Sequence, residues 1–340
     1  MRFGSGRPFW SRRQRATQPV QREPLGYEYN DGGINNQKLA LLGLFLAASK
    51  EDAPLGRRVY LPKIYNKHHD DTLSTREAFG DIFWFDMFKA FADRWQIELV
   101  EQPPSFNDDR LERNGWHYFG QGAGHLGHLA VHDRNAISSD LAADFFRSLV
   151  PRVKSSEEFQ SICGDIFYRN RINAVVQLRI EEDWLHYSRY HLSVVVGSGE
   201  DYCLTAPEII KKVVDTLPEI GGKIYVSCDE RYIPQPKSEI KEAVRASTGA
   251  EIVFKSDVIS AEAFDRMRQV DASLVDFEIG KIANVFVGLS RSTFANMVCF
   301  ERYTCLYRAS QNDYIYNKTG ALLGRRTDLG TQPDPNAATA

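Results

Sequence analysis

The sequence predicts an α/β protein with two Rossmann-like domains that face a central cleft. Strands and helices alternate in both halves of the chain, an interruption near residues 151–170 separates the halves, and 340 residues suffice for two cores. We expect an N-terminal domain at 25–160, a C-terminal domain at 161–325, and tails at 1–24 and 326–340.

The first half supplies a helix, a strand, an amphipathic helix and a second strand. The expected ranges are Leu39–Ala48, Arg58–Pro62, Phe79–Trp95 and Ile97–Val100. Aromatic residues recur at roughly helical spacing in the third range, and a proline ends the first strand. The segment 103–127 breaks the rhythm because it is rich in asparagine, glycine and proline, and a helix resumes over 140–149.

The second half repeats the pattern with more strands. The strands are expected at 173–179, 223–227, 251–254 and 285–288, and the helices at 207–217, 238–248, 261–270, 276–282 and 293–302. Apolar strands separated by helices are typical of a parallel sheet that is buried on both faces.

Composition excludes several classes of protein. The chain is 43% hydrophobic and 26% charged with a formal net charge of −3, so we expect neither a nucleic acid nor a membrane as main partner. No apolar run is long enough for an integral membrane segment. The five cysteines form no Cys-x-x-Cys pair, and their odd number argues against a complete disulfide framework. We therefore expect a cytoplasmic or otherwise soluble protein, the alternative being the soluble portion of a secretory-pathway enzyme.

The first 22 residues contain six arginines and no acidic residue. They lack the apolar stretch of a secretory signal, and we expect a disordered basic tail. A transit peptide, or the remnant of a membrane-anchored parent, is the alternative interpretation.

Arg179 ends the apolar strand at 173–179, where a permanently charged side chain must face a cleft or find a partner. One interpretation is binding of a diphosphate, whose charge grows as a glycosidic bond breaks. The other is a structural ion pair with Glu181, Glu182 or Asp183.

A glycine pair, Gly32 and Gly33, precedes Asn35 and Asn36 just before the first helix. Glycines allow the backbone to approach a ligand, and a helix start offers free N–H groups. The alternative interpretation is a simple turn.

Ser292, Thr293 and Phe294 open the last helix after the strand at 285–288. Hydroxyl groups at this position cap the helix, and together with the free amides they also suit phosphate oxygens. Asp276 is expected to cap a short helix, or to accept hydrogen bonds from the N1–H and N2–H groups of guanine. With Arg179 and the glycine loop, these residues indicate a nucleotide-sugar site.

We expect no metal site. His125, His128 and His132 have helical spacing, but glycines between them disfavour a helix, and Asp133 is the one acidic residue beside them. The polar loop at 68–71 offers no better ligand set. Asn317-Lys-Thr319 has the form of a glycosylation sequon.

Three segments, at 31–37, 176–184 and 276–294, resemble in order the motifs of the GDP-fucose protein O-fucosyltransferases. The resemblance covers roughly residues 27–310, and the segment around Arg179 is its most specific part. It implies a GT-B fold and metal-independent, inverting transfer of fucose from the nucleotide-sugar donor GDP-fucose to a hydroxyl of a protein or glycan acceptor.

The resemblance also implies roles for individual residues. Arg179 would engage the diphosphate, Asn36 would lie near the sugar and the acceptor, and Asp276 would contact guanine. The implied donor-binding set is Gly32, Gly33, Asn35, Asn36, Gln177, Arg179, Asp183, Asp276, Ser292, Thr293 and Phe294. Gln177 stands where the family usually has a histidine, and an amide carries no titratable proton near neutral pH.

Other interpretations remain open from the sequence. The chain could be a catalytically inactive GDP-sugar-binding protein, a transferase for another GDP-hexose such as GDP-mannose, or an unrelated two-domain α/β protein. The irregular segment Pro103–His132 is our candidate for acceptor contact, because loops at a cleft vary with substrate.

Overall fold

A computed structural model describes most of the chain. The described residues are 23–30, 32–49, 57–68, 71–105, 115, 139–192, 199–306 and 312–326. Asp31, the three histidines at 125, 128 and 132, most of Pro103–His132 and nearly all of both expected tails lie outside them.

A six-stranded sheet forms the C-terminal half, in the order β10-β9-β8-β5-β6-β7. Its strands are β5 (Ala174–Gln177), β6 (Lys223–Ser227), β7 (Glu251–Val253), β8 (Val285–Gly288), β9 (Asp313–Ile315) and β10 (Gly324–Arg325). All neighbours pair in parallel except β10, which is antiparallel to β9. The parallel part runs outward from β5 on both sides, which is the order of a doubly wound sheet.

Helices cover both faces of this sheet. The helices of this half are α7 (Glu157–Cys163), α8 (Glu182–Tyr187), α9 (Ala206–Thr216), α10 (Lys237–Thr248), α11 (Ala261–Arg266), α12 (Gln269–Ile282) and α13 (Thr293–Thr304). Short 3₁₀ or π turns lie at 152–155, 164–169, 188–192, 218–220, 230–232 and 255–257. Alternate residues of β5 join different apolar clusters, Val175 one and Val176 the other, so the sheet is buried on both faces as its apolar strands predict.

The N-terminal half is mostly helical in the described residues. Its helices are α1 (Ile34–Ser49), α2 (Phe79–Ile82), α3 (Phe85–Arg94) and α6 (Ser139–Ser148), with a 3₁₀ turn at 71–73. Its strands are β1 (Arg58–Tyr60), β2 (Ile64–Asn66), β3 (Thr75–Glu77) and β4 (Glu98–Val100). β1 and β4 pair in parallel, as a doubly wound domain requires, while β2 and β3 form an antiparallel hairpin that the sequence did not predict. A second large sheet is not present among these residues.

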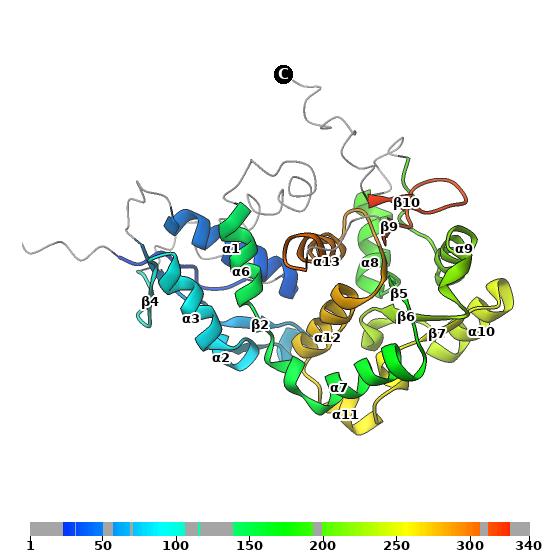
Figure 1. The fold of residues 1–340 in the computed structure, drawn as a ribbon, viewed down its shortest axis with the longest axis horizontal. Helices are drawn as coiled ribbons and strands as arrows, with labels where there is room; N and C mark the ends of the chain where they lie inside the picture. The colour runs from blue at the N-terminus through cyan, green and yellow to red at the C-terminus, as the bar shows by residue number, and fades with distance from the viewer. Residues whose placement is uncertain are drawn as a thin grey trace, which may run out of the picture.

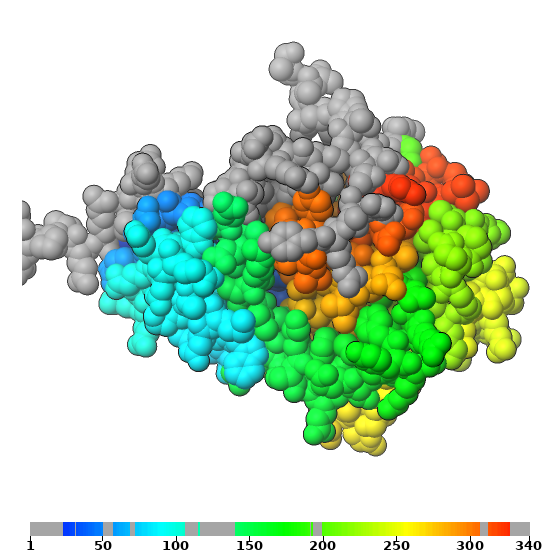
Figure 2. Space-filling view, viewed as in Figure 1, coloured from blue at the N-terminus to red at the C-terminus, as the bar shows by residue number. Residues whose placement is uncertain are grey.

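The two halves share one apolar cluster around α12 and α13. Both helices lie between α1 and α6 on one side and the large sheet on the other (Figure 1). The green residues of α6 and α7 lie between the cyan N-terminal helices and the yellow to orange C-terminal ones (Figure 2). The segment 151–170, expected as a break, is largely helical and packs through its first turn against α12.

Two expected helices have different bounds because distant residues interrupt or extend them. The helix expected over Phe79–Trp95 is broken at Trp84, whose N–H donates to the carbonyl of Val150 at 3.0 Å. α12 begins seven residues before the expected position. Its first turn is satisfied from β2, since the N–H of Val270 donates to Oδ1 of Asn66 at 3.0 Å.

Arg302 ties α12 and α13 to the sheet. Its guanidinium is fully buried, pairs with Asp313 of β9 at 2.8 Å, and donates to the last carbonyls of α12, including that of Ala283 at 2.6 Å. A cation at a helix C-terminus satisfies carbonyl groups that have no partner within the helix. Arg302 of α13 therefore fixes the end of α12 and strand β9 relative to its own helix.

The sequon asparagine is buried rather than exposed. Asn317 is 0% exposed, its Oδ1 accepts from the N–H of Ser290 at 2.9 Å, and its Nδ2 donates to Oγ of the same serine at 3.0 Å. An amide with both ends engaged in the interior is no glycan acceptor in the folded protein. Within the described part of the chain, every helix is too short or too polar to cross a bilayer.

Candidate functional site

A cleft of about 700 Å³ opens at the carboxyl ends of the parallel strands. It is lined by the start of α1, the loop after β2, the segments after β5 and β6, the inner face of α12 and the start of α13. In a doubly wound sheet, ligands bind where two neighbouring strands send their connections in opposite directions. β5 and β8 are those neighbours here, and the motifs around Arg179 and Ser292 follow them directly.

The structure brings ten of the eleven expected site residues to this cleft. They are Gly33, Asn35, Asn36, Gln177, Arg179, Asp183, Asp276, Ser292, Thr293 and Phe294. Gly32 lies behind the lining, one residue from it.

Arg179 makes the structural ion pairs that one interpretation expects, and its side chain also lines the cleft. Its guanidinium lies 3.6 Å from the carboxylate of Glu181 and 3.7 Å from that of Asp183, and 5.1 Å from the centre of the Trp184 ring. Both ion pairs are long, and the side chain keeps 25% of its surface exposed to the cleft. The guanidinium is thus oriented by acids on one side and available to an anionic ligand on the other.

Glu181, one of the two acids beside Arg179, is itself fixed by a backbone contact. It is buried, and its Oε1 accepts from the backbone N–H of Asp229 at 2.9 Å, which joins the segments after β5 and β6. Burial raises the pKa of Glu181, although Arg179 opposes the effect.

The first turn of α1 presents two amide side chains to the cleft. The helix begins at Ile34, five residues earlier than expected, so Asn35 and Asn36 belong to its first turn. Both Oδ1 atoms are buried and have no hydrogen-bond partner among the described residues. Buried acceptors of this kind suit hydroxyl or amide donors of a ligand.

Gly32 shapes this turn. A Cβ atom on Gly32 would lie 2.7 Å from Cβ of Asn36, whereas one on Gly33 would meet nothing within 4 Å. The side chain of Gln37 fixes the turn to β2, since its Nε2 donates to the carbonyls of Gly32 at 3.0 Å and Tyr65 at 2.8 Å. Gly32 therefore supports Asn36 without lining the cleft.

Ser292 caps α13 at the opposite wall. Its Oγ accepts from the backbone N–H of Ala295 at 3.4 Å and from Nε2 of Gln177 at 2.9 Å. The capping expected for this motif is thus confirmed, and the start of a twelve-residue helix faces the cleft. Phe294 packs edge-on against Phe277 of α12, with ring centres 5.6 Å apart, which holds the helix start in place.

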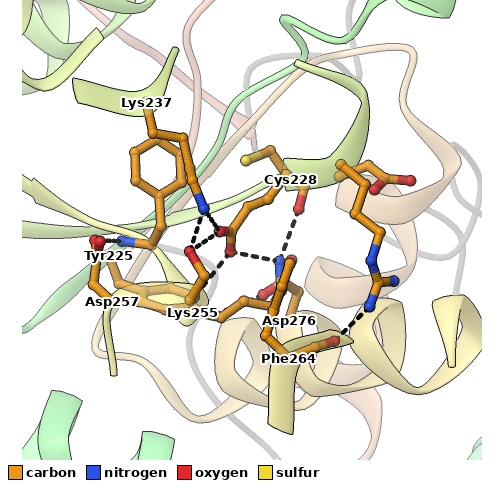
Figure 3. A network of polar contacts seen from close by, with 12 residues as sticks. Tyr225, Cys228, Lys237, Lys255, Asp257, Phe264 and Asp276 are labelled. Atoms are coloured by element: carbon orange, nitrogen blue, oxygen red, sulfur yellow. Dashed lines mark hydrogen bonds and ion pairs between the residues drawn. The ribbon is translucent and has the colours of Figure 1, made fainter. Parts of the chain in front are cut away.

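Asp276 is not a helix cap, contrary to the expectation. It lies in the middle of α12, where Oδ1 accepts from the hydroxyl of Tyr225 at 2.7 Å and Oδ2 lies 2.8 Å from Nζ of Lys255. Figure 3 shows Lys255 directed at Asp276 and at the carbonyl of Cys228. Burial raises the pKa of Asp276 to about 6, against the effect of Lys255, so the carboxyl is ionised at neutral pH.

Several cleft residues were missed from the sequence. Lys255 follows β7 and Glu230 follows β6, and their side chains pair at 3.2 Å. Arg231 donates to Oε1 of Gln269 at 2.7 Å, and Arg291 precedes the cap of α13. Four of these residues come shortly after strands of the parallel sheet, namely Lys255, Glu230, Arg231 and Arg291. That position is the signal that could have identified them. The exception is Gln269, which begins α12.

Within the described ranges no group of three or more His, Cys, Asp or Glu side chains is placed to hold a metal ion. Of the two histidine clusters noted in the sequence, His68 alone is described, and it lines the cleft.

No protein-family model matches this chain, and no curated protein resembles it significantly in sequence. Solved structures of POFUT1 do resemble it in fold. POFUT1 in complex with GDP matches in two crystals, with TM-scores of 0.51 and 0.53 and sequence identities of 15% and 14%. POFUT1 in complex with GDP-fucose matches with a TM-score of 0.51 at 13% identity. The matches cover 87–88% of this chain and 99% of the other. The chain thus has a fucosyltransferase-like fold.

Proposed function

We propose that this chain is a glycosyltransferase that transfers fucose from GDP-fucose to a hydroxyl group of a protein or glycan acceptor. The proposal includes inversion at the sugar carbon and no requirement for a metal ion. It is supported by the likeness in fold to GDP-bound and GDP-fucose-bound POFUT1.

One observation carries the proposal. Arg179 and the capped start of α13 follow neighbouring strands and line one cleft. A guanidinium and free helix N–H groups are the two protein devices best suited to a diphosphate. This combination supports a nucleotide diphosphate as the bound part of the donor.

The chemistry follows from that assignment. As the bond between the sugar and the diphosphate breaks, negative charge accumulates on the departing oxygens, and groups that are already oriented toward them lower the barrier. Arg179 would provide most of this stabilisation, with Ser292 and Thr293 at the helix start. Asn36, whose Oδ1 has no hydrogen-bond partner in the described part of the chain, would accept from a hydroxyl of the sugar or the acceptor.

The proposal extends to a GT-B arrangement with domains at 25–160 and 161–325. In this arrangement Asn35 and Asn36 of the first domain would approach the acceptor side, and the doubly wound sheet of the second would bind the nucleotide. The position of the cleft, lined by α1 from one half and by β5, β6 and α13 from the other, supports this assignment.

A GDP-sugar-binding protein without turnover is the second candidate. It is favoured by Gln177, an uncharged amide at a position from which a titratable side chain could have acted on the reacting groups. A transferase for another GDP-hexose differs from the main proposal only in the sugar.

The decisive test is turnover. The purified chain is incubated with GDP-fucose and, separately, GDP-mannose, with and without EDTA, and with a peptide or a glycan acceptor. Release of GDP with a fucosylated product of inverted anomeric configuration supports the proposal. Binding of GDP-fucose without any product favours the binding protein, and loss of transfer in EDTA contradicts metal independence.

A further inference from the structure

We propose that Gln177 is a positioning residue that makes the Ser292 hydroxyl a hydrogen-bond donor toward a phosphate oxygen of the bound nucleotide. The inference rests on the proposed function, because it assumes that a diphosphate occupies the cleft. It adds a role for Gln177 that is independent of any contact between Gln177 and the ligand.

Because Ser292 Oγ already accepts two hydrogen bonds, its hydroxyl can only donate a further one. A serine hydroxyl has two acceptor lone pairs and one proton to donate. Both lone pairs are used, one by Nε2 of Gln177 at 2.9 Å and one by the N–H of Ala295 at 3.4 Å. No acceptor among the described residues takes the proton, and Ser292 lines the cleft.

The fold holds the side chain of Gln177 next to the hydroxyl of Ser292. It is the last residue of β5, only 4% exposed, and its amide lies against the backbone of Gly288. A Cβ atom on Gly288 would lie 3.5 Å from Oε1 of Gln177 and 2.5 Å from Cβ of Ala295. The glycine thus lets β8 and α13 close tightly around the amide.

The ligand selects this orientation of the amide. With Nε2 toward Ser292, no described residue takes the serine proton, and Oε1 of Gln177 is a buried acceptor that has no partner among these residues. Rotating the amide by half a turn would draw the serine proton to Oε1. Phosphate oxygens only accept hydrogen bonds, so a bound diphosphate stabilises the first orientation. Because an amide has no titratable proton, the donor stays a donor across the neutral pH range.

In the isosteric variant Gln177→Glu, the direction of the hydrogen bond between residue 177 and Ser292 would be reversed. Above about pH 7 its carboxylate only accepts hydrogen bonds, and it would take the Ser292 proton away from the ligand. We expect GDP affinity, measured by calorimetry, to fall about tenfold or more. The variant also adds a negative charge near the phosphates, so this loss alone does not separate the two causes.

A double-mutant cycle with Ser292→Ala separates them. The alanine variant removes the hydroxyl and should itself weaken GDP binding about tenfold. If Gln177 acts through Ser292, Gln177→Glu costs much less affinity in the Ser292→Ala background than in the wild type. If the carboxylate acts only through its charge, it costs the same factor in both backgrounds, and the inference is wrong.

Two controls complete the experiment. Gln177→Met keeps the shape without charge or donor and should weaken GDP binding less than Gln177→Glu, because the serine proton then stays free. Thermal unfolding of each variant shows whether the loss of the cap has unfolded α13. Failure of the wild-type chain to bind GDP overturns the proposed function and this inference together, whereas wild-type binding with an additive cycle overturns the inference alone.

Discussion

The ammonium of Lys255 lies 2.8 Å from the carboxylate of Asp276, and both side chains are almost completely buried beneath the cleft. Glu230 and the carbonyl of Cys228 also contact Lys255, and the hydroxyl of Tyr225 donates to Asp276. The network joins the ends of β6 and β7 to the middle of α12. We expect this network to stabilise the folded protein.

Asp276→Asn should lower the free energy of unfolding by about 3 kcal/mol, because it removes one buried carboxylate partner of Lys255 and leaves the buried ammonium with Glu230. Urea unfolding measures the change. Tyr225→Phe is the matched control, since it removes one hydrogen bond to the same carboxylate and should cost about 1 kcal/mol. Unchanged stability together with a selective loss of guanine nucleotide binding would show instead that Asp276 serves the ligand, as the sequence resemblance implied.

Acid should weaken the same network through Glu230. Burial alone raises the pKa of Glu230, but Lys255 and the hydrogen bond from Ser256 outweigh burial and hold the pKa below its ordinary value. The stability that this carboxylate contributes is therefore present above its unfolded pKa of about 4.3 and is lost as pH falls through the lower, folded value. Glu230→Gln should be less stable than the wild type near neutral pH.

The variant and the wild type should then converge on acidification. Urea unfolding of both proteins at about pH 6 and about pH 3 measures this, because the amide has no proton to gain over that range. A difference in stability that stays constant between the two pH values would contradict this account, because it would mean that Glu230 does not lose its stabilising charge between them.

The two neighbouring glycines of the first motif should respond differently to alanine. Gly32→Ala places a methyl group against the side chain of Asn36, so it should cost about 1–3 kcal/mol of stability and reduce transfer by displacing that amide. Gly33→Ala meets no protein atom within 4 Å and should leave the free energy of unfolding within about 0.5 kcal/mol. Equal destabilisation by the two substitutions would show that the turn differs from the one described.

Arg302→Lys should destabilise the fold even though it keeps the charge. Lysine cannot reproduce the planar set of donors that reaches both Asp313 and the end of α12, and we expect a loss of about 3 kcal/mol. Thermal unfolding measures the effect, with Asp313→Asn as the companion variant. A lysine variant as stable as the wild type would mean that the carbonyls of α12 need no guanidinium.

The sequence predicted four strands of the C-terminal sheet, β5 to β8, because they are short apolar runs bounded by helices, but it did not predict β9 and β10. The strands at 223–227 and 285–288 have the expected bounds, and the cap at Ser292 is where hydroxyl groups before a helix predict it. These features depend on local sequence. The likeness to GDP-bound POFUT1 then supports a fucosyltransferase-like fold, without extending to the family.

Elements fixed by distant contacts were not predictable in this way. The start of α12 depends on Asn66, and the break at Trp84 depends on Val150, which lies 66 residues further along the chain. The burial of Lys255 against Asp276 likewise joins the turn after β7 to α12, which no sequence spacing relates. Asp276 was expected at a helix start because α12 is buried on all sides. Such a helix has no single apolar stripe from which its first residue could be located in the sequence.

The central claim is that Arg179 binds the diphosphate of a guanine nucleotide. Calorimetric titration of GDP, GDP-fucose, GDP-mannose and UDP without metal, into the wild type, Arg179→Lys and Arg179→Ala, tests it most directly. We expect guanine-selective binding by the wild type, a loss of about tenfold or more in the lysine variant, and no measurable binding in the alanine variant. Absence of GDP binding by the wild type, or equal binding by all three proteins, would contradict the claim.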